Sequence, residues 1–391
     1  MRPLPRAPGK RFPLIRLPPS GPFGDMGDDA DMFNHALVLG KFYPPHAGHH
    51  RLVRAAAARS HRTTVAVLGA TVESVPLADR VRWLADEHAV DRGVAIIGDV
   101  DDHPIDFHDD TAWDLHVGVV RSVLARRAIA DGDPRGAPVD AVFSSEAYGA
   151  ELASRLGAKH VAVDPDRTVV AVSGTAVRAD MPAHWGYLAP ATRAGLCARV
   201  VVVGAESTGT TTLSRALAAH YGTEWVAEEG RRHTEDKLAA ATAFAGGTPP
   251  PLDDLVWTVG DFVDVARAQA RREDFAARRG GPLLVCDSDA WAATVWCERY
   301  LGAAHPDVAT DRRPALYLLT DHAGVPFEQD GWRDGEHRRE WMTGRFEELL
   351  AARGVPWVKV SGTAEGRLSQ AVTVCDDLLA RHFRFSDPLT A

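Results

Sequence analysis

The chain has 391 residues, of which 45% are hydrophobic and 25% charged, so it can bury the cores of two globular domains. Its net charge of −9 argues against a general nucleic-acid-binding protein, which would carry a basic surplus. No apolar stretch approaches the roughly 18 residues that a membrane span requires. The cysteines form no C-x-x-C pair, which favours reduced thiols in a cytoplasmic protein; they are Cys197, Cys286, Cys297 and Cys375.

Residues 1–34 differ in composition from the rest of the chain. They hold seven prolines and five lysines or arginines, and they include the acidic stretch "DMGDDAD". Because the segment lacks the apolar core of a secretory signal, we predict a disordered Pro-rich tail. The alternative is a later translation start, at Met26 or Met32.

From residue 35 onward, apolar runs of strand length alternate with stretches of helical spacing. This alternation predicts an α/β protein with two doubly wound parallel sheets, one in a domain at 35–190 and one at 198–391. A short helical bridge is expected at 183–198. Strands are expected at 36–40, 63–69, 94–98, 140–145 and 159–163, then at 199–203, 223–227, 282–287, 315–320 and 356–360. Helices are expected at 48–60, 77–89, 111–130 and 147–156, then at 211–221, up to 279 with a break at 246–251, and at 290–301, 335–353 and 364–382.

A glycine- and proline-rich loop, "GKFYPPHAGH" (40–49), follows the first strand. Gly40 lets a ligand approach the backbone, and Gly48 opens the next helix, whose first N–H groups are unpaired. His46 and His49 are three residues apart and can share one face of that helix start. The loop therefore predicts a polyphosphate site. The plainer interpretations are a tight turn with two surface histidines, or a zinc site that lacks a nearby third ligand.

This loop resembles the H-x-G-H signature of the nucleotidyltransferase superfamily. That superfamily has a second motif after the last strand of the domain, and "VSGTAVRAD" (172–180) fits it. Ser173 and Thr175 can cap the helix that follows, and Arg178 can bind phosphate through its guanidinium group.

Three further stretches narrow the resemblance: "ADRVRWL" (78–84), "VFSSEAYGAEL" (142–152) and "VDPDRT" (163–168). With the two motifs above, they look like the bifunctional nicotinamide mononucleotide adenylyltransferase and ribosylnicotinamide kinase family. The resemblance runs from about residue 36 to 382. It implies that the first domain joins nicotinamide mononucleotide (NMN) to ATP, giving NAD and pyrophosphate, with Mg²⁺ accompanying ATP. It implies ATP contacts by Gly40, Lys41, Phe42, His46, His49, Ser173, Thr175 and Arg178, and NMN contacts by Tyr43, Trp113 and Ser145. For Trp113, a place in the helix core is an equally good interpretation.

The second domain has its own special loop, "GAESTGTTTL" (204–213), between a strand and a helix. This is the layout of the phosphate-binding loop G-x-x-x-x-G-K-[ST], but Thr210 occupies the lysine position. The resemblance implies that Thr211 and Asp287 hold Mg²⁺. Losing the lysine costs roughly 3–4 kcal/mol of barrier, a factor of about 10²–10³ in rate, unless another cation compensates. Predicted ATP contacts in this domain are Gly204, Glu206, Ser207, Thr208, Gly209, Thr210, Thr211, Thr212, Arg333 and Arg338.

Glu228 and Glu229 are the candidate bases for the ribosyl 5′-hydroxyl, although acidic residues also occur at solvated helix starts. The stretch 327–341 looks like a lid that closes over ATP. The cations that could replace the lysine are Arg333, Arg338 and Arg339 in the lid, or Arg231 and Arg232. Three outcomes stay open: a compensated kinase, a nucleotide-binding domain without activity, or a kinase with a different acceptor.

The leading hypothesis is a cytoplasmic enzyme of NAD synthesis whose partners are the small molecules ATP, NMN and ribosylnicotinamide. A different H-x-G-H transferase, or a sensor whose second domain only binds ATP, are the alternatives. Some family members carry an N-terminal helix-turn-helix, but only about 35 residues precede the first strand here, so we expect no nucleic-acid partner. We expect no membrane partner, and homo-oligomer formation stays open.

Overall fold

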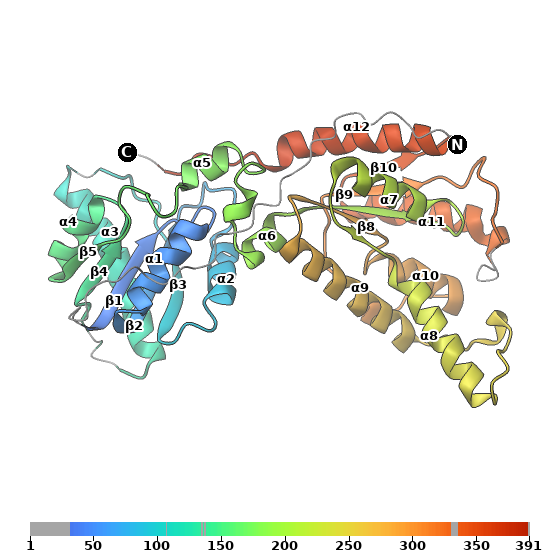
Figure 1. The fold of residues 1–391 in the computed structure, drawn as a ribbon, viewed down its shortest axis with the longest axis horizontal. Helices are drawn as coiled ribbons and strands as arrows, with labels where there is room; N and C mark the ends of the chain where they lie inside the picture. The colour runs from blue at the N-terminus through green and yellow to red at the C-terminus, as the bar shows by residue number, and fades with distance from the viewer. Residues whose placement is uncertain (1–31, 107, 134–135, 137, 330–334, 390–391) are drawn as a thin grey trace. The chain divides into compact units, whose positions relative to one another are not determined.

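The computed structural model describes residues 32–389, apart from 107, 134–135, 137 and 330–334 (Figure 1). Residues 1–31 of the predicted tail and Arg333 therefore lie outside the described residues, whereas Phe33 and Asn34, at the end of the predicted tail, already belong to the first strand. Within the described part, the chain divides into two compact units, one of residues 32–195 with 383–389, and one of Leu196–His382. The predicted boundary assigned 383–389 to the second domain, whereas the structure groups this C-terminal segment with the first unit.

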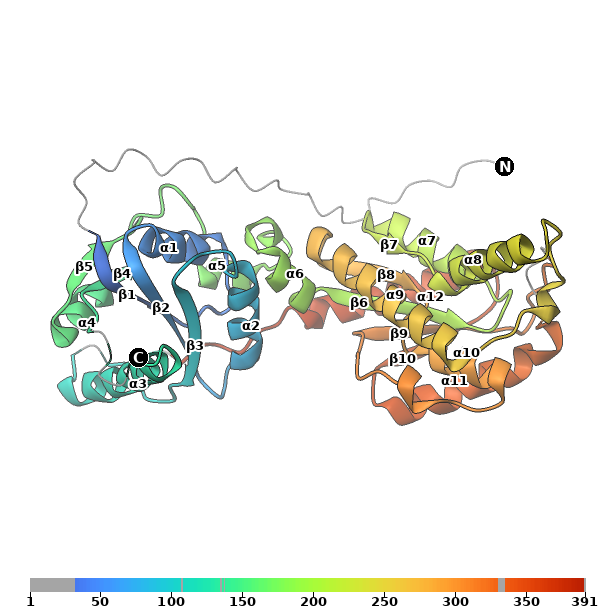
Figure 2. The same ribbon diagram turned by 90° about the horizontal axis from the view of Figure 1, so that it is seen from below.

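The first unit is a parallel sheet of five strands in the order β3-β2-β1-β4-β5, covered by helices on both faces (Figure 2). Successive side chains of a strand point to opposite faces, so Val38 packs with α1 and Leu37 with α3. Its elements are β1 (Phe33–Gly40), α1 (Ala47–Ala57), β2 (Ser60–Gly69), α2 (Leu77–Glu87), β3 (Val94–Val100), α3 (Asp110–Ala130), β4 (Ala141–Ser144), α4 (Tyr148–Leu156), β5 (Lys159–Ala162) and α5 (Gly174–Ala179).

The second unit repeats this architecture with the strand order β10-β9-β6-β8-β7, again all parallel. Leu217 of α7 and Ala371 of α12 pack in one core cluster with the central strands, and α9 and α10 form another. The second unit follows α6 (Pro190–Leu196), which lies in the first unit except for its last residue. Its elements are β6 (Ala198–Gly204), α7 (Thr210–Tyr221), β7 (Trp225–Val226), α8 (Glu229–Phe244), α9 (Val259–Arg279), β8 (Leu283–Asp287), α10 (Ala292–Leu301), β9 (Leu316–Thr320), α11 (Arg339–Arg353), β10 (Trp357–Val360) and α12 (Ala364–His382).

The two doubly wound sheets confirm the predicted fold class. The predicted bridge at 183–198 divides into a short 3-10 helix, Trp185–Tyr187, and α6, which begins at Pro190 as helices often do. The helical region before 279 is broken after α8, where Gly246 and Gly247 both adopt positive φ. Among the described residues, no helix is long and apolar enough to cross a membrane.

Candidate active sites

The first candidate site lies where β1 ends and α1 begins. His46 stands just before α1, is 5% exposed, and its Nδ1 has no hydrogen-bond partner among the described residues. The ring of His49 stacks on it with centroids 3.7 Å apart, and His49 Nδ1 accepts a hydrogen bond from the His46 backbone N–H at 3.2 Å. Since Nδ1 accepts, a neutral His49 carries its proton on Nε2, which is then a donor.

These imidazoles are uncharged at neutral pH. Burial, followed by the charges of Arg167 and Arg178, lowers the pKa of His46 to about 3. Burial, with His46, His50 and Arg167 as neighbours, also holds the pKa of His49 well below its usual value. The site therefore offers neutral hydrogen-bonding rings, and its fixed positive charge comes from the two arginines.

Arg178 lies beside the same loop although it is distant in sequence. Its guanidinium donates to the Tyr43 carbonyl at 2.8 Å, lies 5.2 Å from the Tyr43 ring centroid, and donates to Thr175 Oγ1 at 3.3 Å. Ser173 caps α5 by accepting from the Ala176 N–H at 3.1 Å. The structure thus brings both sequence motifs together at one edge of the sheet, which is where parallel α/β sheets bind ligands.

Sequence reasoning missed Arg167, whose charge acts on both His46 and His49. It adopts positive φ and pairs with Glu146 at 2.6 Å. The stretch "VDPDRT" contains it, so the signal was present but carried no assigned role. Arg167 is a further candidate for binding an anionic ligand at this edge.

A largely apolar cavity of about 140 Å³ lies beside the loop, and Gly40, Lys41, Trp113, Tyr148 and Leu389 line it. Trp113 also packs in the core cluster between α3 and the sheet, which agrees with its predicted place in the helix core, and its contact with NMN stays a prediction.

Two other predicted contacts of this unit serve local structure. Phe42 is buried with its ring 4.8 Å from that of His49. Ser145 is not among the residues lining the cavity, and its hydroxyl donates to the Val163 carbonyl at 2.7 Å.

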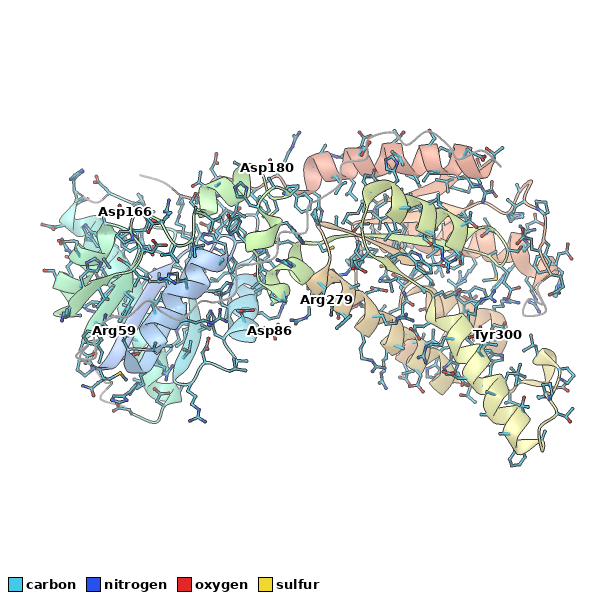
Figure 3. The ribbon with its side chains drawn as sticks, in the orientation of Figure 1. Arg59, Asp86, Asp166, Asp180, Arg279 and Tyr300 are labelled. Atoms are coloured by element: carbon cyan, nitrogen blue, oxygen red, sulfur yellow. The ribbon has the colours of Figure 1, made fainter. Side chains whose placement is uncertain are left out.

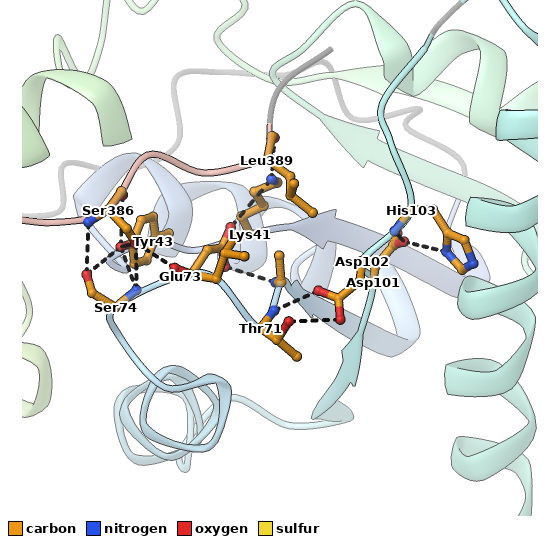
Figure 4. Close-up of polar contacts among 12 residues, drawn as sticks. Lys41, Tyr43, Thr71, Glu73, Ser74, Asp101, Asp102, His103, Ser386 and Leu389 are labelled. Carbon is orange, nitrogen blue, oxygen red and sulfur yellow. Dashed lines mark hydrogen bonds and ion pairs between the residues drawn. The ribbon is translucent and has the colours of Figure 1, made fainter.

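The C-terminal segment 383–389 packs against this same loop (Figure 4). The Tyr43 hydroxyl lies 2.7 Å from Ser74 Oγ and 3.0 Å from Ser386 Oγ. Lys41 Nζ donates to the Leu389 carbonyl at 2.7 Å and lies 3.4 Å from Glu73. Tyr43 and Lys41, both predicted to contact substrate, are therefore engaged with the end of the chain.

The second candidate site is the loop between β6 and α7. Gly209 caps α7 with φ of +86°, a conformation that suits glycine. A side chain at Gly204 would collide with the Thr320 hydroxyl, because its Cβ would lie 2.1 Å away. The loop thus has the backbone of a phosphate-binding loop, whose N–H groups form an anion-binding nest.

Asp287, at the end of β8, faces the start of α7. Thr211 Oγ1 donates to Asp287 Oδ2 at 2.6 Å, and the Thr210 hydroxyl also hydrogen-bonds this carboxylate. Asp287 Oδ1 is buried and has no hydrogen-bond partner among the described residues. Burial raises the pKa of Asp287 despite these hydrogen bonds. A buried carboxylate with a spare oxygen fits a divalent cation such as Mg²⁺, which prefers oxygen ligands.

The two candidate bases differ in their surroundings. Burial and the nearby Asp287 raise the pKa of Glu228, which lines the cavity at the loop. Burial opposes ionisation of Glu229 too, but ion pairs with Arg272 and with Arg232, the latter at 2.8 Å, hold its pKa below the usual value. Of the two candidates, Glu228 is therefore the one that lines the cavity with a raised pKa, whereas Glu229 is engaged in ion pairs.

Several predicted ATP contacts of this loop have structural partners. Glu206 pairs with Arg299 at 2.7 Å, and Ser207 Oγ accepts from the Glu328 N–H at 2.8 Å. Thr208 is buried and lies 2.6 Å from Thr320. The exposed residues Thr212 and Arg338 are not among those lining the cavity.

The arginines that could replace the missing lysine differ in the contacts they make. Arg231 lines the cavity, and its charge acts on both Glu228 and Asp287. Arg232 pairs with Glu229 and Asp236. Arg339 donates to the Ser207 carbonyl at 3.2 Å and so holds the loop itself. Among the described candidates, Arg231 is placed best to act on a bound phosphate.

Sequence reasoning also missed an aromatic wall on this cavity. Trp257, Phe262, Trp296 and Tyr300 line it, and Trp257 lies 5.4 Å from the Phe262 ring and 5.0 Å from the Tyr300 ring, centroid to centroid (Tyr300 is labelled in Figure 3). Flat aromatic surfaces favour the stacking of a planar ring. Phe262 lies on α9, Trp296 and Tyr300 lie on α10, and Trp257 lies in the loop before α9, so no short motif reveals them.

Comparisons with known proteins agree with the division of the chain into two units. A family model described as an AAA domain matches residues 199–367. Among curated proteins, the trifunctional NAD biosynthesis/regulator protein NadR of Salmonella typhimurium is 24% identical over 365 residues, covering 88% of this chain and 83% of that protein. The protein of the same name from Escherichia coli is 24% identical over 344 residues, covering 83% and 78%.

Solved structures give the same likeness in fold. A NadR protein in complex with NR superposes with a TM-score of 0.65 at 20% identity, covering 90% of this chain and 98% of that one. A NadR protein in complex with NAD and AMP-PNP gives a TM-score of 0.62 at 19% identity, covering 92% and 99%. The similarity therefore extends across both units.

Proposed function

Because the chain is homologous to the NadR proteins, we propose that it is an enzyme of NAD synthesis whose two units act on related substrates. The first unit transfers the adenylyl group of ATP to nicotinamide mononucleotide. The second unit phosphorylates ribosylnicotinamide with ATP. The observation that carries the proposal is the meeting of His46, His49, Arg167 and Arg178 at the end of β1.

In the first reaction, the 5′-phosphate of NMN attacks the α-phosphorus of ATP. A new P–O bond forms while the bond from the α-phosphorus to the bridging oxygen breaks, and pyrophosphate leaves. The attacking phosphate has a second pKa of about 6 and is already ionised, so no strong base is required. Catalysis consists of alignment and charge stabilisation, for which Arg167 and Arg178 supply charge and the histidines supply N–H donors.

The pyridine ring of NMN fits the apolar cavity beside this cluster. Trp113 supplies an aromatic surface in its wall, and Gly40 lets the ligand approach the backbone. We propose ATP contacts by Gly40, Lys41, Phe42, Ser173 and Thr175, with Lys41 acting beside the C-terminal segment. A substrate contact by Tyr43 would require its hydroxyl to leave Ser74 or Ser386.

In the second reaction, the 5′-hydroxyl of ribosylnicotinamide attacks the γ-phosphorus of ATP. Glu228 takes the hydroxyl proton, and its raised pKa brings it close to neutral pH, where a general base is most effective. Mg²⁺ bound with ATP would neutralise charge on the phosphates, and Thr211 and Asp287 are the residues that would hold it. Arg231 would supply the charge that Thr210 lacks.

The decisive experiment supplies the purified full chain with ATP and one of three acceptors: NMN, its deamido form, or ribosylnicotinamide. Products are identified by mass. NAD from NMN supports the first activity, and NMN from ribosylnicotinamide supports the second. If no dinucleotide forms from either mononucleotide, the adenylyltransferase proposal is wrong.

Thr210 in the lysine position favours a second candidate function for the C-terminal unit, that of an ATP-binding sensor. In that case ribosylnicotinamide yields no NMN, while ATP still binds the second unit and changes the adenylyl transfer rate. Product formation by Thr210→Lys alone would identify a site that has lost its activity through this substitution.

A further inference from the structure

Two histidines and an aspartate meet on the first unit, between the end of β3 and the helix α3. Asp101 and His103 follow β3, and His116 lies on α3. One ligand atom from each side chain can be chosen so that all three lie within 4.8 Å of one another. We propose that these three residues form a binding site for a divalent transition-metal ion such as Zn²⁺.

The hydrogen bonds of His116 carry the argument. Its Nδ1 lies 2.7 Å from Asp101 Oδ2, and its Nε2 lies 3.1 Å from the Pro104 carbonyl. Both neighbours are acceptors, and a neutral imidazole has only one N–H to donate. A cation bound at one nitrogen is compatible with this geometry, because it takes up the lone pair of that nitrogen while the other nitrogen donates. Donation of Nε2–H to the carbonyl is the usual outer contact of a metal-bound histidine, and it leaves Nδ1 as the ligand.

His103 contacts the other oxygen of the Asp101 carboxylate. Its Nδ1 lies 2.9 Å from Asp101 Oδ1, so each oxygen of Asp101 faces one imidazole (Figure 4 draws the His103 contact). Around zinc, with Zn–N distances of about 2.0–2.1 Å, tetrahedral ligand atoms lie about 3.3 Å apart. Each imidazole Nδ1 would have to move about half an ångström away from its Asp101 oxygen. The three ligand atoms, which lie within 4.8 Å of one another, would converge on one ion through rotation of the two partly exposed histidines.

The ligand set identifies the class of ion. Two imidazoles and one carboxylate suit zinc and neighbouring transition metals, whereas Mg²⁺ and Ca²⁺ prefer oxygen ligands. All three residues also line the cavity that contains Trp113. Three protein ligands leave at least one coordination position, which water or an oxygen atom of a molecule in the cavity can fill.

The test uses the full chain after treatment with a chelator, with Zn²⁺ as the probe and a competing chromogenic chelator as the readout. No nucleotide is needed, so the result is independent of the proposed function. The variants are His103→Ala, His116→Ala and Asp101→Asn, and the control is His108→Ala, an exposed histidine outside the cluster. Circular dichroism verifies that each variant is folded.

We expect one equivalent of Zn²⁺ to bind the parent and the control, and each ligand variant to lose affinity by more than 100-fold, beyond the 10–100-fold typical of outer contacts. Added Zn²⁺ should raise the thermal midpoint of the parent and the control only. The proposal is overturned if the parent does not bind at micromolar Zn²⁺, or if folded ligand variants bind as tightly as the control. If the alanine variants do not fold, the Zn²⁺ affinity of Asp101→Asn, which keeps the shape of the side chain, decides between the two outcomes.

Discussion

Thr211 Oγ1 donates to Asp287 Oδ2 at 2.6 Å, which joins the start of α7 to the end of β8 across 76 residues. Thr210, in the lysine position, also directs its hydroxyl to this carboxylate. The substitution therefore leaves the proposed metal ligands in place, and it removes one positive charge from the phosphate side of the loop.

Arg231→Ala should lower ribosylnicotinamide phosphorylation by about 10²–10³-fold, because Arg231 is the described cation that lines the cavity next to Glu228. The matched control is Arg232→Ala, whose guanidinium pairs with Glu229 and Asp236. NMN formation from ribosylnicotinamide and ATP is the readout, with NAD formation as the internal reference. Equal losses in both variants would show that Arg231 has no special role.

His49→Ala should reduce NAD formation by at least about 10²-fold, since it removes an N–H donor from the proposed phosphate site. Ribosylnicotinamide phosphorylation should not change, because His49 belongs to the first unit. His61→Ala, an exposed histidine outside the cluster, serves as the control. Retention of full adenylyl transfer by His49→Ala would remove the basis for assigning this cluster to ATP.

The contribution of His46 to the free energy of unfolding should fall as the pH is lowered from about 6.5 towards 4, whereas the raised pKa values of Glu228 and Asp287 act in the opposite direction. In the folded chain the pKa of His46 is lowered to about 3, so this residue binds more protons in the unfolded chain throughout this interval. His49 and His50, whose pKa values are also lowered, add in the same direction.

The variant that checks this pH dependence is His46→Gln. It should reduce the slope by up to about 1.4 kcal/mol per pH unit, measured by denaturant unfolding across the interval. His61→Gln is the matched control. A slope that is the same in His46→Gln and the parent would contradict the expectation.

Deletion of residues 384–391 should raise the KM for NMN roughly tenfold, with little effect on ribosylnicotinamide phosphorylation. Leu389 lines the cavity and Ser386 holds Tyr43, so the deletion removes part of the wall. Tenfold corresponds to about 1.4 kcal/mol, close to the value for burying one leucine side chain. Deletion of residues 390–391 alone is the control, and similar kinetics in both shortened chains would argue against this role of the segment.

The fold could be predicted from the sequence because it depends on local patterns. Buried parallel strands give continuous apolar runs such as "RVVVV" (199–203), and their helices have regular spacing. The two glycine-containing loops can likewise be recognised from a few consecutive residues. The largest differences are at β7 and the bridge, where tertiary context shortens elements that sequence pattern alone would extend.

The remaining site features depend on contacts between distant residues. Glu228 and Glu229 are adjacent in sequence, but one faces Asp287 and the other pairs with Arg272, 43 residues away. Lys41 meets Leu389 across 348 residues. Such pairs leave no periodic signal in a single sequence. The predicted ATP and NMN contacts therefore remain predictions, with the structure indicating which of them share a site.

The grouping of residues 383–389 with the first unit has a consequence for biosynthesis. A ribosome makes this segment only after the 187 residues, 196–382, that separate it from the rest of the first unit. At about 5–20 residues per second, this interval takes roughly 10–40 s. A nascent first unit would spend that time without this part of its wall, so its cavity would be completed only after the second unit has been translated.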